Sequence, residues 1–238
     1  MNGPGALAGR VTEIRTRIER AAARSGRPAS AITLVAASKT QPAEAVRAAL
    51  AAGVTVFGEN RVQEADAKIP LAGGGTWHMI GRLQRNKARR AAELFALVHS
   101  LDSLRLGEAL DRVGRERGRP VPVLIEVNLG GEESKGGFTA DALDAALDVL
   151  AGLPGLAVRG FMTVPPPAED PAASRPHFRT LARLLAAARD AGRVPTTAVE
   201  LSMGMSDDFE VGIEEGATMV RVGTALFGPR AYPASISG

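Results

Sequence analysis

"ITLVAASKTQPAEAVRAALAA", residues 32–52, contains one complete strand, turn and helix. Residues 32–36 are mostly β-branched or aliphatic, which predicts a buried strand. The strand runs out at Lys39, and a proline then separates it from an alanine-rich helical stretch, residues 43–52. Lysine is rarely fully buried, so a solvated strand end is the plainest interpretation of Lys39. The rest of the chain has to decide between that interpretation and a functional one.

The same alternation repeats along the whole chain. Eight short apolar runs predict strands at residues 32–36, 54–57, 76–80, 97–100, 121–127, 157–162, 198–201 and 219–222. Helices are expected at 43–52, 60–68, 84–94, 103–118, 139–152, 175–191 and 207–215, with a short one after Thr224. Such alternation predicts parallel strands joined by right-handed crossovers. Eight units favour a single (β/α)8 barrel of the TIM type over a doubly wound sheet, which would carry a glycine fingerprint after its first strand.

Two segments flank the predicted barrel. Residues 6–24 have apolar positions at helical spacing and stop before Gly26, which predicts an extra N-terminal helix. The residues after Arg230 show no hydrophobic periodicity. We therefore expect one barrel domain over residues 1–230 and a loose tail over 231–238.

Composition excludes several classes of protein. The chain has 238 residues, 45% of them hydrophobic, and no cysteine, which rules out disulfides, thiolate metal sites and cysteine nucleophiles. No stretch approaches about 18 consecutive apolar residues, and residues 1–10 lack signal-peptide features, so we expect a cytoplasmic protein without a membrane partner. The formal charge of +3 does not indicate a nucleic-acid partner. The one dense basic run, residues 82–90, is most simply a solvated helix face, although it could attract phosphorylated ligands or an acidic partner.

Ligand groups of a barrel collect where its strands end. After the seventh and eighth predicted strands the chain carries Ser202 and Ser206, then Gly223 and Thr224. Hydroxyl groups and closely approaching backbone N–H groups suit a phosphate, although ordinary turn chemistry uses the same residues.

A lysine across the barrel from a phosphate site is the arrangement for pyridoxal 5'-phosphate (PLP) held as a Schiff base. The amine of Lys39 must be partly neutral to attack an aldehyde, and burial together with the charge of Arg221 would lower its pKa. A guanidinium beside the pyridine nitrogen would keep that nitrogen unprotonated and weaken the ring as an electron sink.

Six blocks of the sequence, in this order, resemble one family: "LVAASKTQP", "FGENRVQEA", "WHMIGRLQRNK", "LIEVNLGGEESKGG", "GFMTVPPP" and "ELSMGMSDDFEVGIEEGATMVRVGTALFG". The family is that of the pyridoxal phosphate homeostasis proteins, which look like the barrel domain of alanine racemase standing alone. The resemblance runs from about residue 6 to about residue 230. It implies the following cofactor contacts: Lys39 in the Schiff base, Arg221 at the pyridine nitrogen, Ser206, Gly223, Thr224 and Ser202 at the phosphate, Asn60 as a polar contact, and His78 against the ring face.

Other polar residues allow a plainer interpretation. Lys135 lies on a glycine-rich loop and is either a second, transient lysine for the aldehyde or a solvated loop residue. His99 and His177 have no metal-ligand neighbours in the sequence and are interpreted as structural, and we expect no metal site. A network of Glu59, Arg61 and Glu64 is expected to consist of surface ion pairs.

Three functions remain open at this stage. The first is a non-catalytic carrier that buffers PLP and delivers it to apo-enzymes; the family likeness suggests that it is a monomer. The second is an amino-acid racemase, which needs two proton carriers on opposite faces of the cofactor; the only tyrosine is Tyr232 in the tail. The third is a barrel enzyme acting on a small phosphorylated metabolite.

Overall fold

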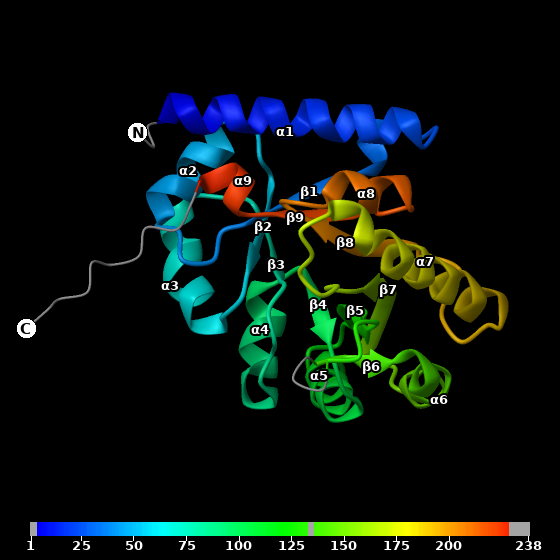
Figure 1. Cartoon of the computed structure of the whole chain (residues 1–238). Coiled ribbons are helices and arrows are strands. Elements are labelled where there is room, and N and C mark those ends of the chain that lie inside the picture. Colours follow the sequence, from blue (N-terminus) through cyan, green and yellow to red (C-terminus); the bar gives the residue numbers. More distant parts are fainter. Residues whose placement is uncertain (1–3, 133–135, 229–238) are drawn as a thin grey trace, which may run out of the picture.

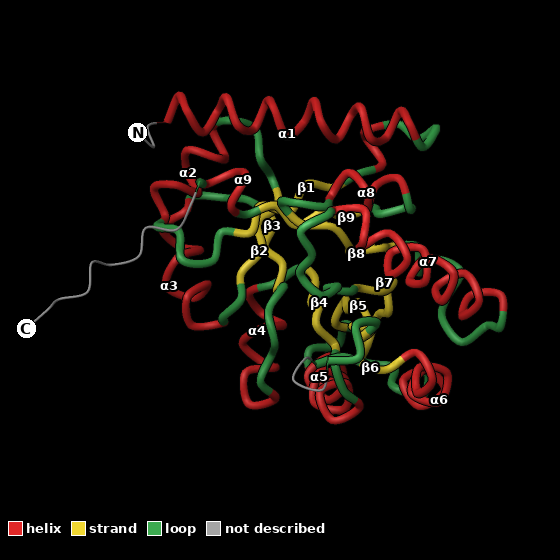
Figure 2. Tube along the Cα trace, viewed as in Figure 1, coloured by secondary structure: helices red, strands yellow, loops and turns green. Residues whose placement is uncertain are grey.

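The computed structural model describes residues 4–132 and 136–228, which form a closed barrel of eight parallel strands (Figures 1 and 2). The strands of the barrel are β1 Thr33–Ala37, β2 Val56–Glu59, β3 Thr76–Met79, β4 Leu97–Leu101, β5 Val121–Asn128, β7 Leu156–Met162, β8 Glu200–Met205 and β9 Met219–Val222. Pairing of β4 with β5 and of β1 with β9 closes the ring. A short strand, β6 Phe138–Thr139, pairs with β5 outside the ring. The predicted TIM-type barrel is confirmed.

Helices surround the barrel. They are α1 Pro4–Arg24, α2 Ala43–Ala51, α3 Val62–Ala72, α4 Ala88–Leu94, α5 Leu104–Glu116, α6 Ala140–Leu150, α7 Arg175–Asp190, α8 Phe209–Glu214 and α9 Thr224–Phe227, with 3-10 turns η1 Ala29–Ala31, η2 Arg85–Lys87 and η3 Pro171–Ser174. The extra helix α1 lies along α2, α8 and α9 (Figure 1). Over the described residues, no helix combines the length and apolar character that a membrane crossing requires.

Burial follows the two periodicities that the sequence contains. Helix α1 buries positions spaced by three or four residues, among them Leu7, Val11, Ile14 and Ile18, and these join the large cluster between strands and helices. A separate small cluster draws one residue from each of five barrel strands, namely Val35, Leu97, Leu124, Met162 and Met219. Because strand side chains alternate between the two faces, this second cluster fills the barrel interior below the polar mouth.

Near the mouth, several elements begin or end later than predicted: β2 ends at Glu59 and α3 begins at Val62, and the same holds for β8 and α8. Strand β8 continues to Met205, whereas the sequence suggested an end at residue 201, so Ser202 belongs to a strand and not to a loop. Gly204 in this strand has a φ of +91°, and a Cβ there would lie 2.8 Å from Cα of Phe209, so a larger residue would not fit without a shift of the backbone. Helix α8 starts at Phe209 instead of residue 207, since Asp208 uses its carboxylate to accept from Met205 N–H at 2.7 Å. The proposed tail, residues 231–238, lies outside the described residues.

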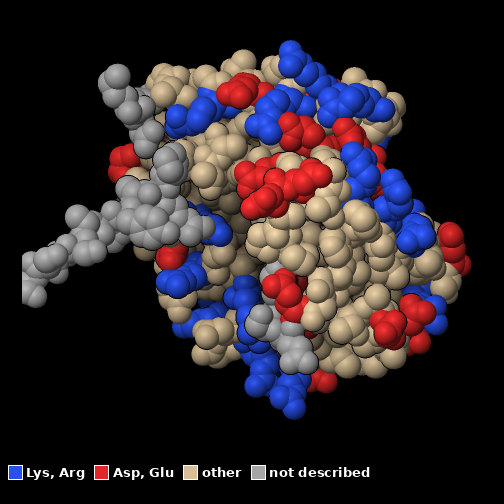
Figure 3. All heavy atoms as spheres, viewed as in Figure 1, with Lys and Arg blue, Asp and Glu red and all other residues tan. Residues whose placement is uncertain are grey.

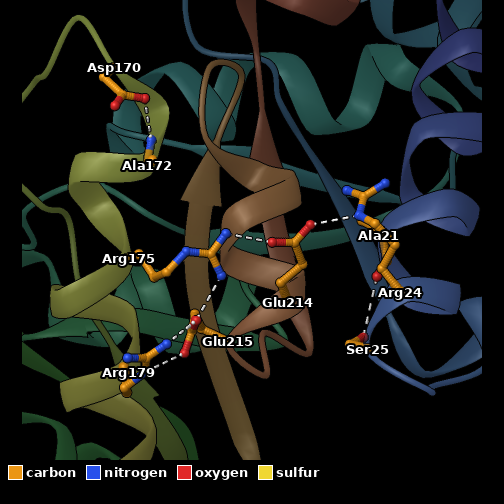
Figure 4. A network of polar contacts seen from close by, with 9 residues as sticks. All are labelled: Ala21, Arg24, Ser25, Asp170, Ala172, Arg175, Arg179, Glu214 and Glu215. Carbon is orange, nitrogen blue, oxygen red and sulfur yellow. Dashed lines mark hydrogen bonds and ion pairs between the residues drawn. The ribbon is translucent and has the colours of Figure 1, made fainter.

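Ion pairs join α1, α8 and α7 on the outside of the barrel (Figure 4). Arg24 binds Glu214 at 2.7 Å, and Arg175 bridges Glu214 and Glu215 at 2.6 and 2.8 Å. Arg179 adds a second contact to Glu215 at 2.9 Å. Hydrogen bonds from these arginines lower the pKa of both glutamates. The network ties the N-terminal helix to the C-terminal third of the barrel.

Candidate functional site

Lys39 lies in a strained turn directly after β1. Gln41 N–H donates to the Ser38 carbonyl at 2.9 Å, which closes the turn, and Thr40 takes a φ of +65°. A β-branched residue is unfavourable in this left-handed region, and such strain concentrates at functional sites. Lys39 is half-buried at this position. The turn therefore holds the lysine at the barrel mouth at a conformational cost.

A buried ion pair supports this turn from below. Lys68 Nζ donates to the Ser38 carbonyl at 2.8 Å and to Glu59 Oε1 at 2.6 Å, and Ser38 Oγ donates to the same carboxylate oxygen at 2.6 Å. Lys68 is 9% exposed and Glu59 is fully buried. The expectation of a surface pair was wrong for Glu59, because its position in β2 faces α3 instead of solvent. For Arg61 and Glu64 it is confirmed, with the exposed Arg61 at 3.4 Å from Glu64.

Arg221 is a buried cation on β9 beside β1. Its guanidinium donates to Ser202 Oγ and, at 2.9 Å, to the Thr163 carbonyl. Burial lowers the pKa of Arg221 to about 10, and the charges of Glu126 and Asp208 oppose that effect. The described residues place no carboxylate within ion-pair distance of it. A guanidinium has five N–H donors, so Arg221 keeps donors for a ligand.

Two histidines extend the hydrogen-bond chain that starts at Arg221. His99 Nδ1 lies 2.9 Å from Ser202 Oγ, and His99 Nε2 lies 3.0 Å from His78 Nδ1. Arginine can only donate, and no other described group accepts the Ser202 proton, so that proton goes to His99 Nδ1. His99 must then donate from Nε2 to His78 Nδ1. The chain assigns both histidines as neutral Nε2–H tautomers and leaves His78 Nε2–H to donate to a further acceptor.

Burial supports this assignment. It lowers the pKa of His78 to about 4, and it lowers the pKa of fully buried His99 well below the usual range, with smaller effects from the charges of His78 and Arg221. The interpretation of His99 as merely structural missed this chain. His99 contacts His78 of β3, 21 residues away, and Ser202 of β8, 103 residues away, so no local signal in the sequence could reveal these contacts.

The predicted phosphate residues meet where β8 and β9 end. Gly223 and Ala225 N–H both point at Ser206 Oγ, each at 3.3 Å, which is at the long end of the hydrogen-bond range. Thr224 is exposed beside them. A Cβ on Gly223 would lie 3.3 Å from the Ala37 carbonyl of β1, two residues before Lys39. The structure therefore brings Ser206, Gly223 and Thr224 together next to the lysine turn. Ser202 lies deeper and bonds Arg221 and His99.

Asn60 directly follows β2 and is half-buried. A Cβ on Gly81 would lie 2.6 Å from Cα of Asn60, so the loop after β3 can approach only because residue 81 is glycine. Asn60 thus lies at the same rim as Lys39 and His78. His177 lies apart, in the first turn of α7, and Lys135 falls outside the described residues. The described ranges contain no group of three acidic or histidine side chains that could hold a metal ion.

Glu126 on β5 is a further polar residue that the sequence interpretation missed. Burial raises its pKa to about 7, with an additional effect of the Asp102 charge, while Arg221 and Arg82 act in the opposite direction. Glu126 occurs two residues after Leu124, which belongs to the interior cluster. A carboxyl at an inward position of an apolar strand was the signal that could have identified it.

Comparison with known proteins agrees with this geometry. The family model of the alanine racemase N-terminal domain matches residues 10–231. A pyridoxal phosphate homeostasis protein of Aquifex aeolicus is 43% identical over 225 residues, covering 94% of this chain and 98% of that protein. The chain belongs to the pyridoxal phosphate homeostasis protein family. The family member of Escherichia coli is 41% identical over 231 residues, covering 95% and 97% of the two chains.

Solved structures of the family superpose closely on this barrel. PipY of Synechococcus elongatus, at 39% identity, gives TM-scores of 0.82 without PLP and 0.80 with PLP bound, covering 93% of this chain and 100% of PipY. Alanine racemase of Corynebacterium glutamicum gives 0.70 at 21% identity, covering 95% of this chain and 62% of the racemase. The last comparison shows a shared fold only.

Proposed function

We propose that the protein binds PLP through Lys39 and acts in PLP homeostasis as a carrier without catalytic turnover. The observation that carries the proposal is the buried Arg221 guanidinium, which has no described carboxylate within ion-pair distance and lies at the same mouth as the strained lysine turn. The relatives named pyridoxal phosphate homeostasis proteins and the PLP-bound structure of PipY support it.

The donor set fits this cofactor. PLP needs an amine for its aldehyde, N–H and hydroxyl donors for its phosphate, and a partner for its ring nitrogen. Lys39 offers the amine, and Ser206 with the N–H groups of Gly223 and Ala225 offers loosely engaged donors for an anion. Arg221 is aligned by the Thr163 carbonyl and Ser202. Asn60 and His78 complete the proposed contacts.

When bound, PLP supplies an electrophilic aldehyde and an electron-withdrawing ring. Arg221 would donate to the ring nitrogen and, since it retains its own proton, would keep that nitrogen unprotonated. The chain through Ser202 and His99 holds the guanidinium in place and fixes His78 as a donor. These residues would bind and orient the cofactor, and they favour its storage over carbanion chemistry on its ring.

Racemisation remains the weaker alternative. It needs a second proton carrier on the face of the cofactor opposite the lysine. Tyr232, the only tyrosine of the chain, lies outside the described residues. The homologues are named for homeostasis and not for racemisation.

Absorbance and trapping test the proposal. Adding PLP should produce a near-ultraviolet or visible band, and borohydride should attach the cofactor stably to Lys39. Lys39→Ala should lose this adduct, whereas Lys87→Ala should keep it. An unchanged adduct in Lys39→Ala would overturn the assignment. Incubation with single enantiomers of alanine tests turnover, because appreciable interconversion would contradict a carrier role.

Delivery to apo-enzymes, a cytoplasmic setting and a monomeric state belong to the same proposal. Light scattering tests the last of these, and a mass of two chains would contradict it. Delivery is tested by mixing the holo-protein with an apo form of a PLP-dependent enzyme. Recovery of that enzyme's activity should exceed the recovery caused by the free PLP that dissociates in the same time.

A further inference from the structure

A groove of about 1540 Å3 opens beside the proposed cofactor site. Its walls come from the start of α3, the segment after β3 that includes η2, and α5 as far as Arg112. Asn60 and Asp102, which lie where β2 and β4 end, line its inner edge. The groove therefore begins at the barrel rim and runs outward between helices.

The groove has an excess of positive charge. Its lining includes the basic residues Arg61, Arg82, Arg85, Lys87, Arg105 and Arg112. Of its three acidic residues, Glu64 is paired with Arg61 and Asp102 with Arg82, each at 3.4 Å. Only Glu108 remains to offset the other four cations, none of which forms an ion pair within the described part of the chain.

The basic run of residues 82–90 divides at the start of α4. Arg89 pairs with Glu116, and Arg90 pairs with Asp66 and Glu93. These two arginines stay outside the groove, while Arg82, Arg85 and Lys87 line it. Arg89 and Arg90 lie on α4, as the helix-face interpretation expected, whereas the exposed Arg82 and Arg85 precede that helix. Figure 3 shows basic side chains gathered on the surface near α4 and α5.

The shape and chemistry of the groove select the kind of partner. At about 1540 Å3 it is larger than a typical small-molecule pocket, which holds about 300–1000 Å3. Its described lining contains no aromatic side chain on which a nucleobase could stack. Unpaired arginines suit carboxylates, with which they form forked hydrogen bonds.

We propose that this groove docks an acidic segment of the apo-enzyme that receives PLP, next to the mouth from which the cofactor leaves. This inference rests on the proposed carrier function. Long-range attraction between the unpaired cations and such a segment would speed the encounter and would weaken as salt rises.

The test uses the full-length holo-protein and a fluorescent octaglutamate peptide as the acidic probe. The groove variant carries Arg85→Glu, Lys87→Glu and Arg105→Glu. The matched control carries Arg20→Glu, Arg119→Glu and Arg183→Glu, which change the net charge equally at exposed positions outside the groove. Fluorescence anisotropy measures affinity, and the PLP absorbance band shows whether the cofactor site is intact.

We expect the groove variant to bind the peptide at least tenfold more weakly than wild type, and the control less than threefold more weakly. Transfer of PLP to an apo-enzyme should slow in the groove variant alone. Equal loss in both variants, or no peptide binding by wild type, would overturn the proposal. Tighter binding of a 16-nucleotide single strand than of the peptide would also overturn it. Loss of the PLP band in wild type would instead contradict the carrier function.

Discussion

Lys68 and Arg221 are both buried cations at the barrel mouth, but they have different partners. Lys68 binds the Glu59 carboxylate at 2.6 Å and the Ser38 carbonyl at 2.8 Å. Arg221 binds one hydroxyl and one carbonyl, and the described residues offer it no carboxylate within ion-pair distance. Both side chains have lost most of their contact with water.

The difference separates a cation that is compensated within the protein from one that retains donors for the proposed ligand. Desolvating a charge is costly unless a counter-charge or hydrogen bonds compensate for it. Lys68 is compensated within the protein and shapes the turn of Lys39. Arg221 retains donors, and a ligand that accepts from it would complete its environment. Four substitutions can break or sharpen this comparison.

Lys68→Met should have the largest effect, because it leaves the Glu59 carboxylate buried without its counter-charge. Breaking one partner of a buried pair costs about 3–5 kcal/mol in the free energy of unfolding. Urea denaturation measures the loss. Adding Glu59→Gln removes the stranded charge and should recover much of it. If the double variant is no more stable than Lys68→Met, the pair is not the source of the effect.

Glu126→Gln should change the pH dependence of stability. The folded pKa of Glu126 is raised to about 7, so its contribution to stability is present at low pH and is lost as the pH rises through that value. The folded pKa of His78 is lowered to about 4, so its contribution is lost as the pH falls from about 6.5. In wild type, Glu126 therefore makes the free energy of unfolding fall with rising pH, whereas His78 makes it rise.

In Glu126→Gln the opposing effect of the carboxyl group is removed, and the effect of His78 on the pH dependence of stability remains. The free energy of unfolding should then rise with pH between 4.5 and 7 by about 2–3 kcal/mol more than in wild type. Urea denaturation at half-unit pH intervals checks this. Parallel curves for the two proteins would exclude the carboxyl as an opposing group.

Arg221→Met should weaken PLP binding at least tenfold, or about 1.4 kcal/mol, with little change in the stability of the apo-protein. Burial of the charge, which lowers the pKa to about 10, opposes folding by on the order of 3 kcal/mol. Two hydrogen bonds from a charged donor offset this with about 1.5–3 kcal/mol each. PLP titration and thermal melting measure the two quantities. A large drop in the apo melting temperature would make Arg221 a structural cation like Lys68.

Arg175→Ala should have the smallest effect. This arginine is part of the partly exposed network with Glu214 and Glu215, and such pairs contribute about 0–1 kcal/mol each. The pKa of both glutamates is lowered, so their contribution is present at neutral pH and lost on acidification. Melting in low and high salt should show a deficit that shrinks with salt. Arg175→Ala should retain the PLP affinity of wild type, in contrast to Arg221→Met.

Most of the fold was predictable because each βα unit is encoded locally. The apolar run of residues 121–127 and the helical periodicity of residues 103–118 can each be recognised without reference to distant segments. The end of β8 was not predictable, because Ser202 to Met205 contain glycine and serine that suggest a turn. Pairing with β7 and β9 extends the strand through them.

The rim positions of the candidate site were also predictable. Lys39, Ser206, Gly223 and Thr224 directly follow or border apolar runs, and parallel strands in a barrel all end on one side. Their roles toward PLP stay predictions. The partners below the rim were not predictable: His99 and Ser202 are separated by 103 residues, and Ser38 and Lys68 by 30.

The sequence by itself determined eight alternating units, the lysine after the first strand and the small polar residues after the last two, because these depend on local periodicity and order along the chain. Only the tertiary structure decided which polar groups are compensated. Packing of α3 on β2 sets Lys68 against Glu59, whereas the pairing of β8 with β9 leaves Arg221 in contact with Ser202 and with no described carboxylate within ion-pair distance. Desolvation and pairing depend on neighbours in space, and the packing of strands and helices in the barrel supplies those neighbours.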